Sequence, residues 1–145
     1  MRVTKYYIFL DVTVVYICHM LYIIAYWRKK FIIINKTGRK NKVGHWLLIL
    51  QPNTECVEFF DSLGGNGRSL KRLRKYSPVV LFNESRVQGH SSQNCGLFCV
   101  YVAYWRLLNI DQTFSESMAD IFTTNFAIND NIVVDFMADY NAERQ

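Results

Sequence analysis

The stretch Val87-Gln88-Gly89-His90-Ser91-Ser92-Gln93-Asn94-Cys95-Gly96-Leu97-Phe98-Cys99 leads from a polar turn into an apolar run that extends to Leu108. The run has almost no polar face, so it predicts a buried helix, and Ser92 or Asn94 can cap its first turn. Cys95 then lies at a helix N-terminus, where unpaired N–H groups and the helix dipole favour a thiolate. The position suits a nucleophile, although a small cysteine packed in the core fits the same pattern.

Composition indicates one folded domain with a substantial core. The chain has 145 residues, of which 50% are hydrophobic and 15% aromatic, so disorder is excluded as a general state. A formal net charge of +5 favours an anionic partner, with nucleic acid ahead of lipid headgroups, although simple solubility explains the same charge. The four cysteines show no paired framework of the kind that small secreted domains use, which indicates a reducing compartment.

The N-terminal segment, residues 1–30, differs from the rest of the chain. Its run from Tyr6 to Trp27 is long enough to cross a bilayer, but Asp11 near the midplane would cost about 2.5 to 3.5 kcal/mol. Basic residues lie on both sides, so charge gives no orientation, and His19 within the run fits a buried, hydrogen-bonded histidine. A membrane anchor, a buried helix or strand pair, and a mis-started reading frame all stay open for this segment.

The remaining residues, 31–145, have the pattern of a globular domain that mixes strands and helices. Strands are expected at residues 31–34, 46–50, 56–60 and 79–82, and helices at 68–76, 115–126 and 132–140, the last two capped by Ser115 and Asn131. Pro52 and Asn53 predict a turn that joins the second and third strands into a hairpin. The last two helices are expected to serve packing.

The hairpin predicts a contact between two polar residues. If its centre is Asn53, His45 and Asp61 lie directly opposite each other, and such Cβ atoms are about 4.5 to 5.5 Å apart. This separation suits a carboxylate that fixes the tautomer and orientation of an imidazole.

Four residues then form a candidate catalytic group. Cys95 is the candidate nucleophile, His45 the base, and Asp61 the residue that orients the base. Gln88 can offer its side-chain amide to an oxyanion, alongside the backbone N–H of Cys95. His90 is a weaker alternative base, because it has no acidic neighbour in a paired strand.

Other side chains bear on metal and nucleic-acid binding. Cys95 and Cys99 lie one helical turn apart, but no second ligand pair accompanies them, so no metal is expected and Cys99 is assigned to the core or the site lining. The glycine-rich turn at residues 62–67 lacks the ending of a phosphate-binding loop. A basic cluster is a candidate DNA-binding surface, with a solvated helix face as the alternative, and it comprises Arg68, Lys71, Arg72, Arg74 and Lys75.

The chain resembles the adenovirus endopeptidase (adenain) family of cysteine proteases, within the wider group of SUMO and other ubiquitin-like-protein proteases. The resemblance covers roughly half of the chain and rests on Ile34–Arg39, Gly44–Trp46, Phe59–Gly64, and Val87–Gly89 followed by Cys95–Cys99. It implies an α+β fold, a small mixed β-sheet packed against helices with a papain-like core and the catalytic order His-Asp-Cys. His45, Asp61, Gln88 and Cys95 match the histidine, the acidic residue, the oxyanion glutamine and the nucleophile of that family.

The resemblance also implies a function. It predicts an adenain-like endopeptidase that cleaves viral or DNA-transposon precursor proteins at Gly-containing sites, as a monomer located in the host nucleus and the virion. The alternatives are a protease that deconjugates a ubiquitin-like modifier, and an inactive remnant. No cofactor is expected. Stimulation by DNA stays open because of the basic cluster, and membrane association stays open through residues 6–27. A disulfide-linked peptide activator is not expected, because residues 66–87 contain no cysteine.

Besides the missing activator cysteine, the chain departs from the family in two further respects. It is shorter than adenain, and its first thirty residues match nothing in that family. Those residues normally contribute to the fold and the substrate cleft.

Overall fold

The structure is a computed structural model that describes residues 13–17, 21–25, 30–36, 44–65 and 67–143. In chain order its elements are β1 (Thr13–Ile17), β2 (Leu21–Ala25), β3 (Lys30–Lys36), β4 (His45–Gln51), β5 (Cys56–Phe60), α1 (Gly67–Leu73), β6 (Val79–Phe82), α2 (Cys95–Leu108), α3 (Phe114–Ile121) and α4 (Phe126–Ala142). The chain thus has the α+β fold that the sequence predicts.

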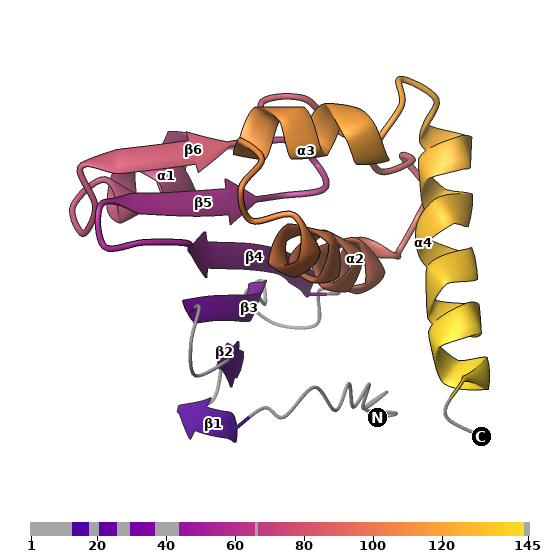
Figure 1. Ribbon diagram of the computed structural model, residues 1–145, viewed down its shortest axis with the longest axis horizontal. Coiled ribbons are helices and arrows are strands. Elements are labelled where there is room, and N and C mark those ends of the chain that lie inside the picture. Colours follow the sequence, from indigo (N-terminus) through magenta and orange to yellow (C-terminus); the bar gives the residue numbers. More distant parts are fainter. Residues whose placement is uncertain (1–12, 18–20, 26–29, 37–43, 66, 144–145) are drawn as a thin grey trace.

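A four-stranded mixed sheet, in the order β3-β4-β5-β6, forms the centre of the molecule (Figure 1). β3, β4 and β5 are antiparallel neighbours, whereas β6 runs parallel to β5 after a connection through α1. Because β4 and β5 are antiparallel, β4 begins and β5 ends at the same end of the sheet. This end lies toward α4 (Figure 1).

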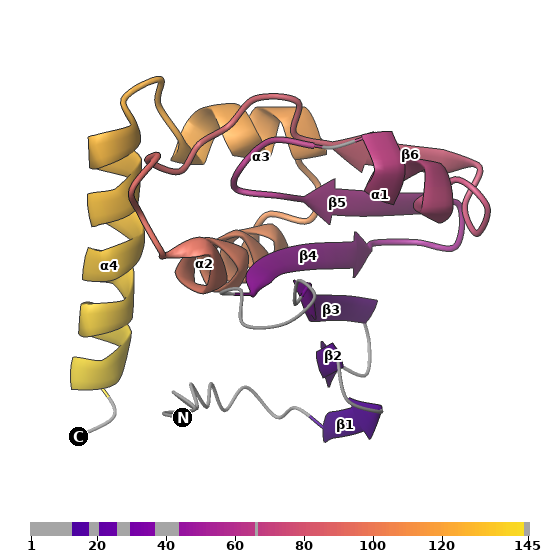
Figure 2. The same cartoon turned by 180° about the vertical axis from the view of Figure 1, so that it is seen from behind.

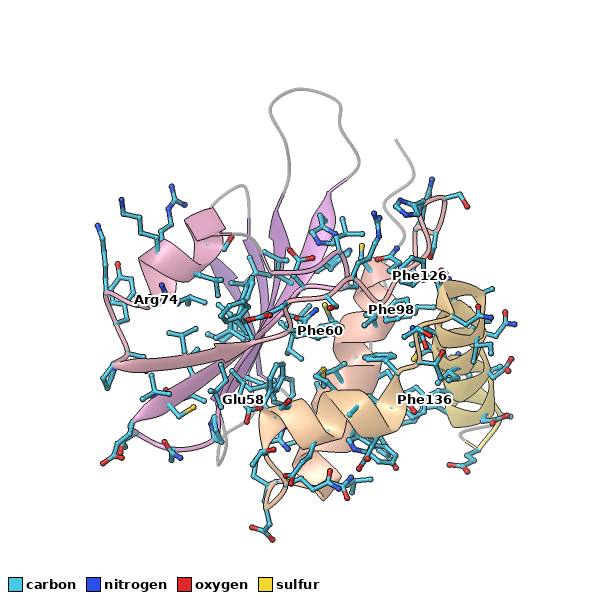
Figure 3. All side chains as sticks on the ribbon, turned by 90° about the horizontal axis from the view of Figure 1, so that it is seen from above. Glu58, Phe60, Arg74, Phe98, Phe126 and Phe136 are labelled. Atoms are coloured by element: carbon cyan, nitrogen blue, oxygen red, sulfur yellow. The ribbon has the colours of Figure 1, made fainter. Side chains whose placement is uncertain are left out.

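The two faces of the sheet carry separate apolar cores because side chains alternate along each strand. On one face Leu48 and Phe60 pack with Phe98 of α2, in the larger core. On the other face Leu47 and Phe59 pack with Leu70 of α1. α1 and α2 therefore cover opposite faces, and Figure 3 shows Arg74 on the side of the sheet away from Phe98.

Aromatic rings connect α2 to the last two helices. Phe122, which directly follows α3, has its ring centroid 6.0 Å from that of Phe60 and 5.5 Å from that of Phe98. Phe136 of α4 contacts Tyr101 and Tyr104 of α2. α4 is thereby fixed beside α2, as both ribbon views show (Figures 1 and 2).

One ion pair lies inside the larger core. Arg106 of α2 and Glu58 of β5 are 1% and 3% exposed at their side chains, and the guanidinium donates to both carboxylate oxygens at 2.9 and 2.7 Å. The same guanidinium donates to the Ser117 hydroxyl of α3 at 2.8 Å. The pair joins β5, α2 and α3 at a single point.

The described part of the apolar N-terminal segment is a strand pair. β1 and β2 form an antiparallel hairpin with Thr13 opposite Ala25, next to β3 (Figure 1). This is one of the alternatives that the sequence left open, and His19 and Asp11 lie outside the described residues. Among the described residues, every helix is too short or too polar to cross a membrane.

Several expected boundaries were wrong. The helices expected at 115–126 and 132–140 span Phe114–Ile121 and Phe126–Ala142, with Thr113 and Asn125 at their N-caps in place of Ser115 and Asn131. The expected basic helix at 68–76 ends at Leu73. The strands at 56–60 and 79–82 are confirmed to the residue.

Candidate active site

The imidazole of His45 and the carboxylate of Asp61 are in direct contact. His45 is the first residue of β4, Asp61 directly follows β5, and His45 Nε2 lies 2.7 Å from Asp61 Oδ1. The expected register is wrong, however, because Leu48 pairs with Phe60 and Leu50 with Glu58. The ladder is therefore centred one residue later than Asn53, and His45 meets Asp61 as a diagonal neighbour. A shift of two positions keeps both residues on their faces, which preserves the contact.

The shift has its cause in the turn. The Asn53 side-chain oxygen accepts hydrogen bonds from the backbone N–H groups of Glu55 and Cys56, both at 2.9 Å. An asparagine that bonds its own following backbone extends the loop, since it replaces ladder bonds there.

The backbone around Asp61 is clamped by Asn83, which follows β6. Asn83 Nδ2 donates to the Asp61 carbonyl at 2.7 Å, and Asn83 Oδ1 accepts from the Asp61 N–H at 3.0 Å. The Leu63 N–H donates to Asp61 Oδ1 at 2.9 Å, so the oxygen that faces His45 also carries a backbone bond. Asp61 is buried, and these bonds hold its carboxylate toward the imidazole.

The thiol of Cys95 lies on the other side of the imidazole. Cys95 is the first residue of α2, and its thiol lies close enough to the His45 side chain for the imidazole to lower the pKa of the thiol. Because His45 Nε2 contacts Asp61, Nδ1 is the ring nitrogen left for the thiol. The structure thus brings Cys95, His45 and Asp61 together in one line of contact, from thiol to imidazole to carboxylate.

The pKa of the imidazole is raised and the pKa of the thiol is lowered, so that each shift favours the charged form of its group. Burial alone would lower the pKa of His45, but the hydrogen bond and the negative charge of Asp61, together with those of Cys95, raise it to about 9. Burial alone would raise the pKa of Cys95, but His45 and the backbone N–H groups of Trp46 and Gly96 lower it below the ordinary value. The site is therefore suited to a thiolate–imidazolium pair at neutral pH.

The expected capping bond at the start of α2 is wrong. Asn94 occupies the N-cap position, but its side chain makes no capping hydrogen bond. Ser92 Oγ instead accepts the Asn94 N–H at 3.2 Å, within the turn that precedes the helix. The first-turn N–H groups of α2 are thus left open toward the Cys95 thiolate, whose charge they favour.

Gly96 provides close contact between α2 and the strand that carries His45. A Cβ at this position would lie 3.3 Å from Cδ1 of the Trp46 indole, which is tighter than ordinary van der Waals contact. Trp46 directly follows His45, so the absence of a side chain at Gly96 allows the thiol and the imidazole to approach.

The carboxamide of Gln88 is buried, with 2% of the residue exposed, and is held by two serines. Ser62 Oγ donates to Gln88 Oε1 at 2.6 Å, and Gln88 Nε2 donates to the Ser92 carbonyl at 2.8 Å and to Ser92 Oγ at 3.2 Å. The Ser62 carbonyl also accepts the N–H groups of Val87 and Gln88. The role of the Gln88 carboxamide as an oxyanion donor stays a prediction.

The other sequence candidates lie away from this contact line. In an exposed turn, His90 Nδ1 accepts a hydrogen bond from Arg86 Nη1 at 2.9 Å, and the His90 ring packs against Phe126. Cys99 is buried in the core, and burial raises the pKa of its thiol well above the ordinary value. Among the described residues no group of three or more His, Cys, Asp or Glu side chains could hold a metal ion.

The described basic side chains of the candidate DNA-binding surface are exposed. They lie on and after α1, on the face of the sheet opposite α2, and comprise Lys71, Arg72, Arg74 and Lys75. The side chain of Arg68 lies outside the described residues.

Sequence reasoning missed the residues that fix the candidate site residues, or the turn beside them, by hydrogen bonds. Ser62 could have been suspected, because it directly follows Asp61. Asn83, Ser92 and Asp130 gave no local signal, since each acts on a partner that only the fold brings near.

A thiol at the start of a buried helix, an imidazole at a strand start and a carboxylate at the neighbouring strand end define the papain-like class of cysteine protease folds. The chain has this fold, as its resemblance to the adenain and SUMO-protease group predicts.

One solved structure supports this fold. No known family's sequence profile matches the chain, and no curated protein sequence matches it. Among solved structures, ChlaDub1 from Chlamydia trachomatis is similar, with a TM-score of 0.54 and 16% identity over 79% of this chain and 60% of that one. The ASFV pS273R protease has a TM-score of 0.47 and 17% identity, over 77% of this chain and 45% of that one. The chain thus spans 60% of the ChlaDub1 structure.

Proposed function

We propose that the chain is a cysteine endopeptidase of the adenain type. The observation that carries this proposal is the position of His45, whose imidazole is hydrogen-bonded to Asp61 and lies beside the Cys95 thiol, so that both groups raise the pKa of the imidazole. A nucleophile, a base and a residue that orients the base, each within hydrogen-bond reach of the next, are what covalent acyl transfer requires.

The proposed reaction cleaves a peptide bond in two steps. The Cys95 thiolate attacks the scissile carbonyl carbon, and its electron pair becomes the new S–C bond while the carbonyl oxygen takes the negative charge. When this intermediate collapses, the C–N bond breaks, and the leaving amine takes the proton of the His45 imidazolium. The product of this step is a thioester between Cys95 and the acyl part of the substrate.

Water completes the cycle. Neutral His45 accepts a proton from a water molecule, which attacks the thioester and releases the carboxylic product and the thiolate. The oxyanion of both tetrahedral intermediates would be held by the Cys95 N–H and by Gln88. Asp61 keeps the imidazole oriented and favours its protonated form.

The substrate class is proposed from the sequence resemblance. It comprises viral or DNA-transposon precursor proteins with glycine before the cleaved bond, met in the host nucleus or the virion, with no cofactor required. The exposed basic side chains on and after α1 support DNA as a second partner, because four cations lie within five residues, Lys71 to Lys75. The alternative activity is deconjugation of a ubiquitin-like modifier.

Two measurements test the proposal. Purified protein is incubated with short fluorogenic peptides that end in Gly-Gly or Gly-Ala, and separately with folded ubiquitin-like modifiers that carry the same reporter. We expect cleavage of the short peptides, abolished in Cys95→Ala and in His45→Ala while circular dichroism is unchanged. Cleavage of folded modifiers alone would establish deconjugation. Iodoacetamide labelling of Cys95 no faster than that of free cysteine, with no cleavage, would establish an inactive remnant.

A further inference from the structure

The carboxylate of Asp130 lies across the turn that joins Gln88 to Cys95. Asp130 belongs to α4, and its Oδ2 accepts the Gly89 N–H at 3.0 Å. Its Oδ1 accepts the hydroxyl proton of Ser92 in a short hydrogen bond. One carboxylate thus holds the turn at two points, from a helix that the sequence assigned to packing alone.

The bond from Ser92 to Asp130 determines what the serine oxygen can do. A hydroxyl has one proton and two lone pairs, so a serine that donates to Asp130 keeps both lone pairs for other donors. They accept the Gln88 Nε2 group and the Asn94 N–H, each at 3.2 Å. Asp130 is thereby connected to the candidate oxyanion amide and to the residue that precedes Cys95.

The opposite end of the Gln88 carboxamide is fixed by Ser62. Since Gln88 Oε1 accepts the Ser62 proton, the amide cannot flip, and Nε2 faces Ser92. The bond from Nε2 to the Ser92 carbonyl, at 2.8 Å, is shorter than the bond to Ser92 Oγ, at 3.2 Å. Nε2 is therefore held mainly by the Ser92 carbonyl, and Asp130 fixes the position of that carbonyl because it bonds the Ser92 hydroxyl and the Gly89 N–H of the same turn.

The approach of α4 to the turn depends on Gly89. A Cβ on Gly89 would lie 2.6 Å from Asp130 Oδ2, a distance at which the carboxylate must move. Asp130 is half-buried, and it reaches the turn because this position has no side chain.

We propose that Asp130 is a positioning residue of the active site, which acts through Ser92 to hold the Gln88 carboxamide toward the oxyanion. This inference rests on the proposed function, and it assigns to α4 a part in transition-state stabilisation. Asp130 touches neither the thiol nor the substrate in this scheme, so its loss weakens catalysis only as far as Gln88 is misplaced.

A double-mutant cycle on peptide cleavage tests the inference. Asp130→Ala is expected to lower kcat by about tenfold or more, but by less than the roughly 10² to 10³-fold loss from removing an oxyanion donor, with KM little changed. In a Gln88→Ala background, Asp130→Ala is expected to cause no further loss. Gly89→Ala should reproduce the Asp130→Ala effect without removing a polar group. Asp130→Asn, which keeps the shape and one acceptor, should fall between Asp130→Ala and the wild type.

The matched control is Asp135→Ala, which removes an exposed carboxylate from the same helix and should leave kcat unchanged. A loss of the same size in both Gln88 backgrounds would overturn the inference, as would normal kcat in Asp130→Ala beside an inactive Cys95→Ala. If Asp130→Ala does not fold, Asp130→Asn carries the same cycle.

A second measurement does not depend on activity. In ¹⁵N-labelled protein the Gln88 side-chain amide signals should shift in Asp130→Ala and not in Asp135→Ala. If wild-type protein cleaves no peptide, the proposed function fails, and the signals still decide whether Asp130 holds Gln88. Unchanged signals in Asp130→Ala would overturn the inference on their own.

Discussion

His45 Nε2 lies 2.7 Å from Asp61 Oδ1, although the two residues are not opposite each other in the β4–β5 ladder. The contact is made diagonally at the end of the sheet, where β4 begins and β5 has ended. There the Asp61 carboxylate is held by the loop that follows the strand and not by strand pairing.

The first prediction concerns the pH dependence of cleavage. The pKa of His45 is raised from 6.5 to about 9, so the imidazolium persists through this interval and is lost as the pH rises past about 9. The pKa of Cys95 is lowered, so the thiolate forms below the ordinary thiol range. The plot of activity against pH should therefore be bell-shaped, with its two limbs at the macroscopic pKa values of the Cys95–His45 pair. Asp61→Asn removes the charge that raises the pKa of His45, so the alkaline limb should move to lower pH. An alkaline limb at the same pH in Asp61→Asn and in the wild type would show that Asp61 does not raise the pKa of His45.

The second prediction concerns selective alkylation. Cys95 should react with iodoacetamide at pH 7 faster than Cys56 and Cys99, because burial raises the pKa values of those two thiols. Mass mapping of the labelled peptides measures each rate. In His45→Ala the rate at Cys95 should fall to that of an ordinary buried thiol, since the groups that lower its pKa are reduced to backbone N–H donors. Equal rates in the two proteins would contradict the ion pair.

The third prediction concerns the tight contact at Gly96. Gly96→Ala places a methyl group 3.3 Å from the Trp46 ring, so the ring and the adjacent His45 must shift by a few tenths of an ångström. Since small misplacements of reacting groups are costly, we expect a loss of about tenfold in kcat, with the melting temperature lowered by a few degrees at most. Leu108→Ala, an exposed position on the same helix, is the control and should leave kcat unaltered.

The fourth prediction concerns the buried ion pair. Arg106→Met leaves the Glu58 carboxylate buried without its partner, which should lower the free energy of unfolding by about 3 to 5 kcal/mol. The double variant Glu58→Leu/Arg106→Met should recover much of this loss, because neither charge is left. Urea unfolding measures both values. A double variant as unstable as Arg106→Met would show that the lost packing and the other lost hydrogen bonds of Arg106, and not the orphaned charge, dominate.

The fifth prediction concerns DNA. Binding of duplex DNA should weaken steeply with salt and show little sequence preference, because phosphate contacts release counterions. Replacing Lys71, Arg72, Arg74 and Lys75 by glutamine should flatten the salt dependence and leave basal peptide cleavage intact, since these residues lie across the sheet from α2. Titrations at several salt concentrations measure the slope. Equal slopes for the variant and the wild type would contradict the proposal that these side chains bind DNA.

The fold could be predicted where the signal is local. Strands such as Cys56–Phe60 are set by short apolar runs between turn residues, and α2 by an apolar stretch after a polar turn. The start of α3 was missed although its signal is local too, because Thr113 and Glu116 form a capping box that the sequence displays. The start of α4 at Phe126 was placed six residues late, since the cap at Asn125 was overlooked.

The site could be predicted in its members but only partly in its geometry. His45 and Asp61 meet because a register shift of two preserves faces, whereas the value of the shift depends on Asn53 bonding its own backbone. Asp130 could not be predicted, since it lies 38 residues from Ser92 and becomes its neighbour only when α4 packs beside α2. Such contacts depend on tertiary packing, which leaves no mark on the sequence around either residue.

The place of Asp130 in the chain has a consequence for how the protein is made. Synthesis at roughly 5 to 20 residues per second separates Ser92 from Asp130 by about 2 to 8 seconds. During that interval the thiol, the imidazole and the carboxylate of Asp61 have all been synthesised, but the carboxylate that holds the turn has not. The turn between Gln88 and Cys95 can therefore reach its final form only after α4 has been made, so the Gln88 carboxamide is positioned after the residues of the candidate site itself have been synthesised.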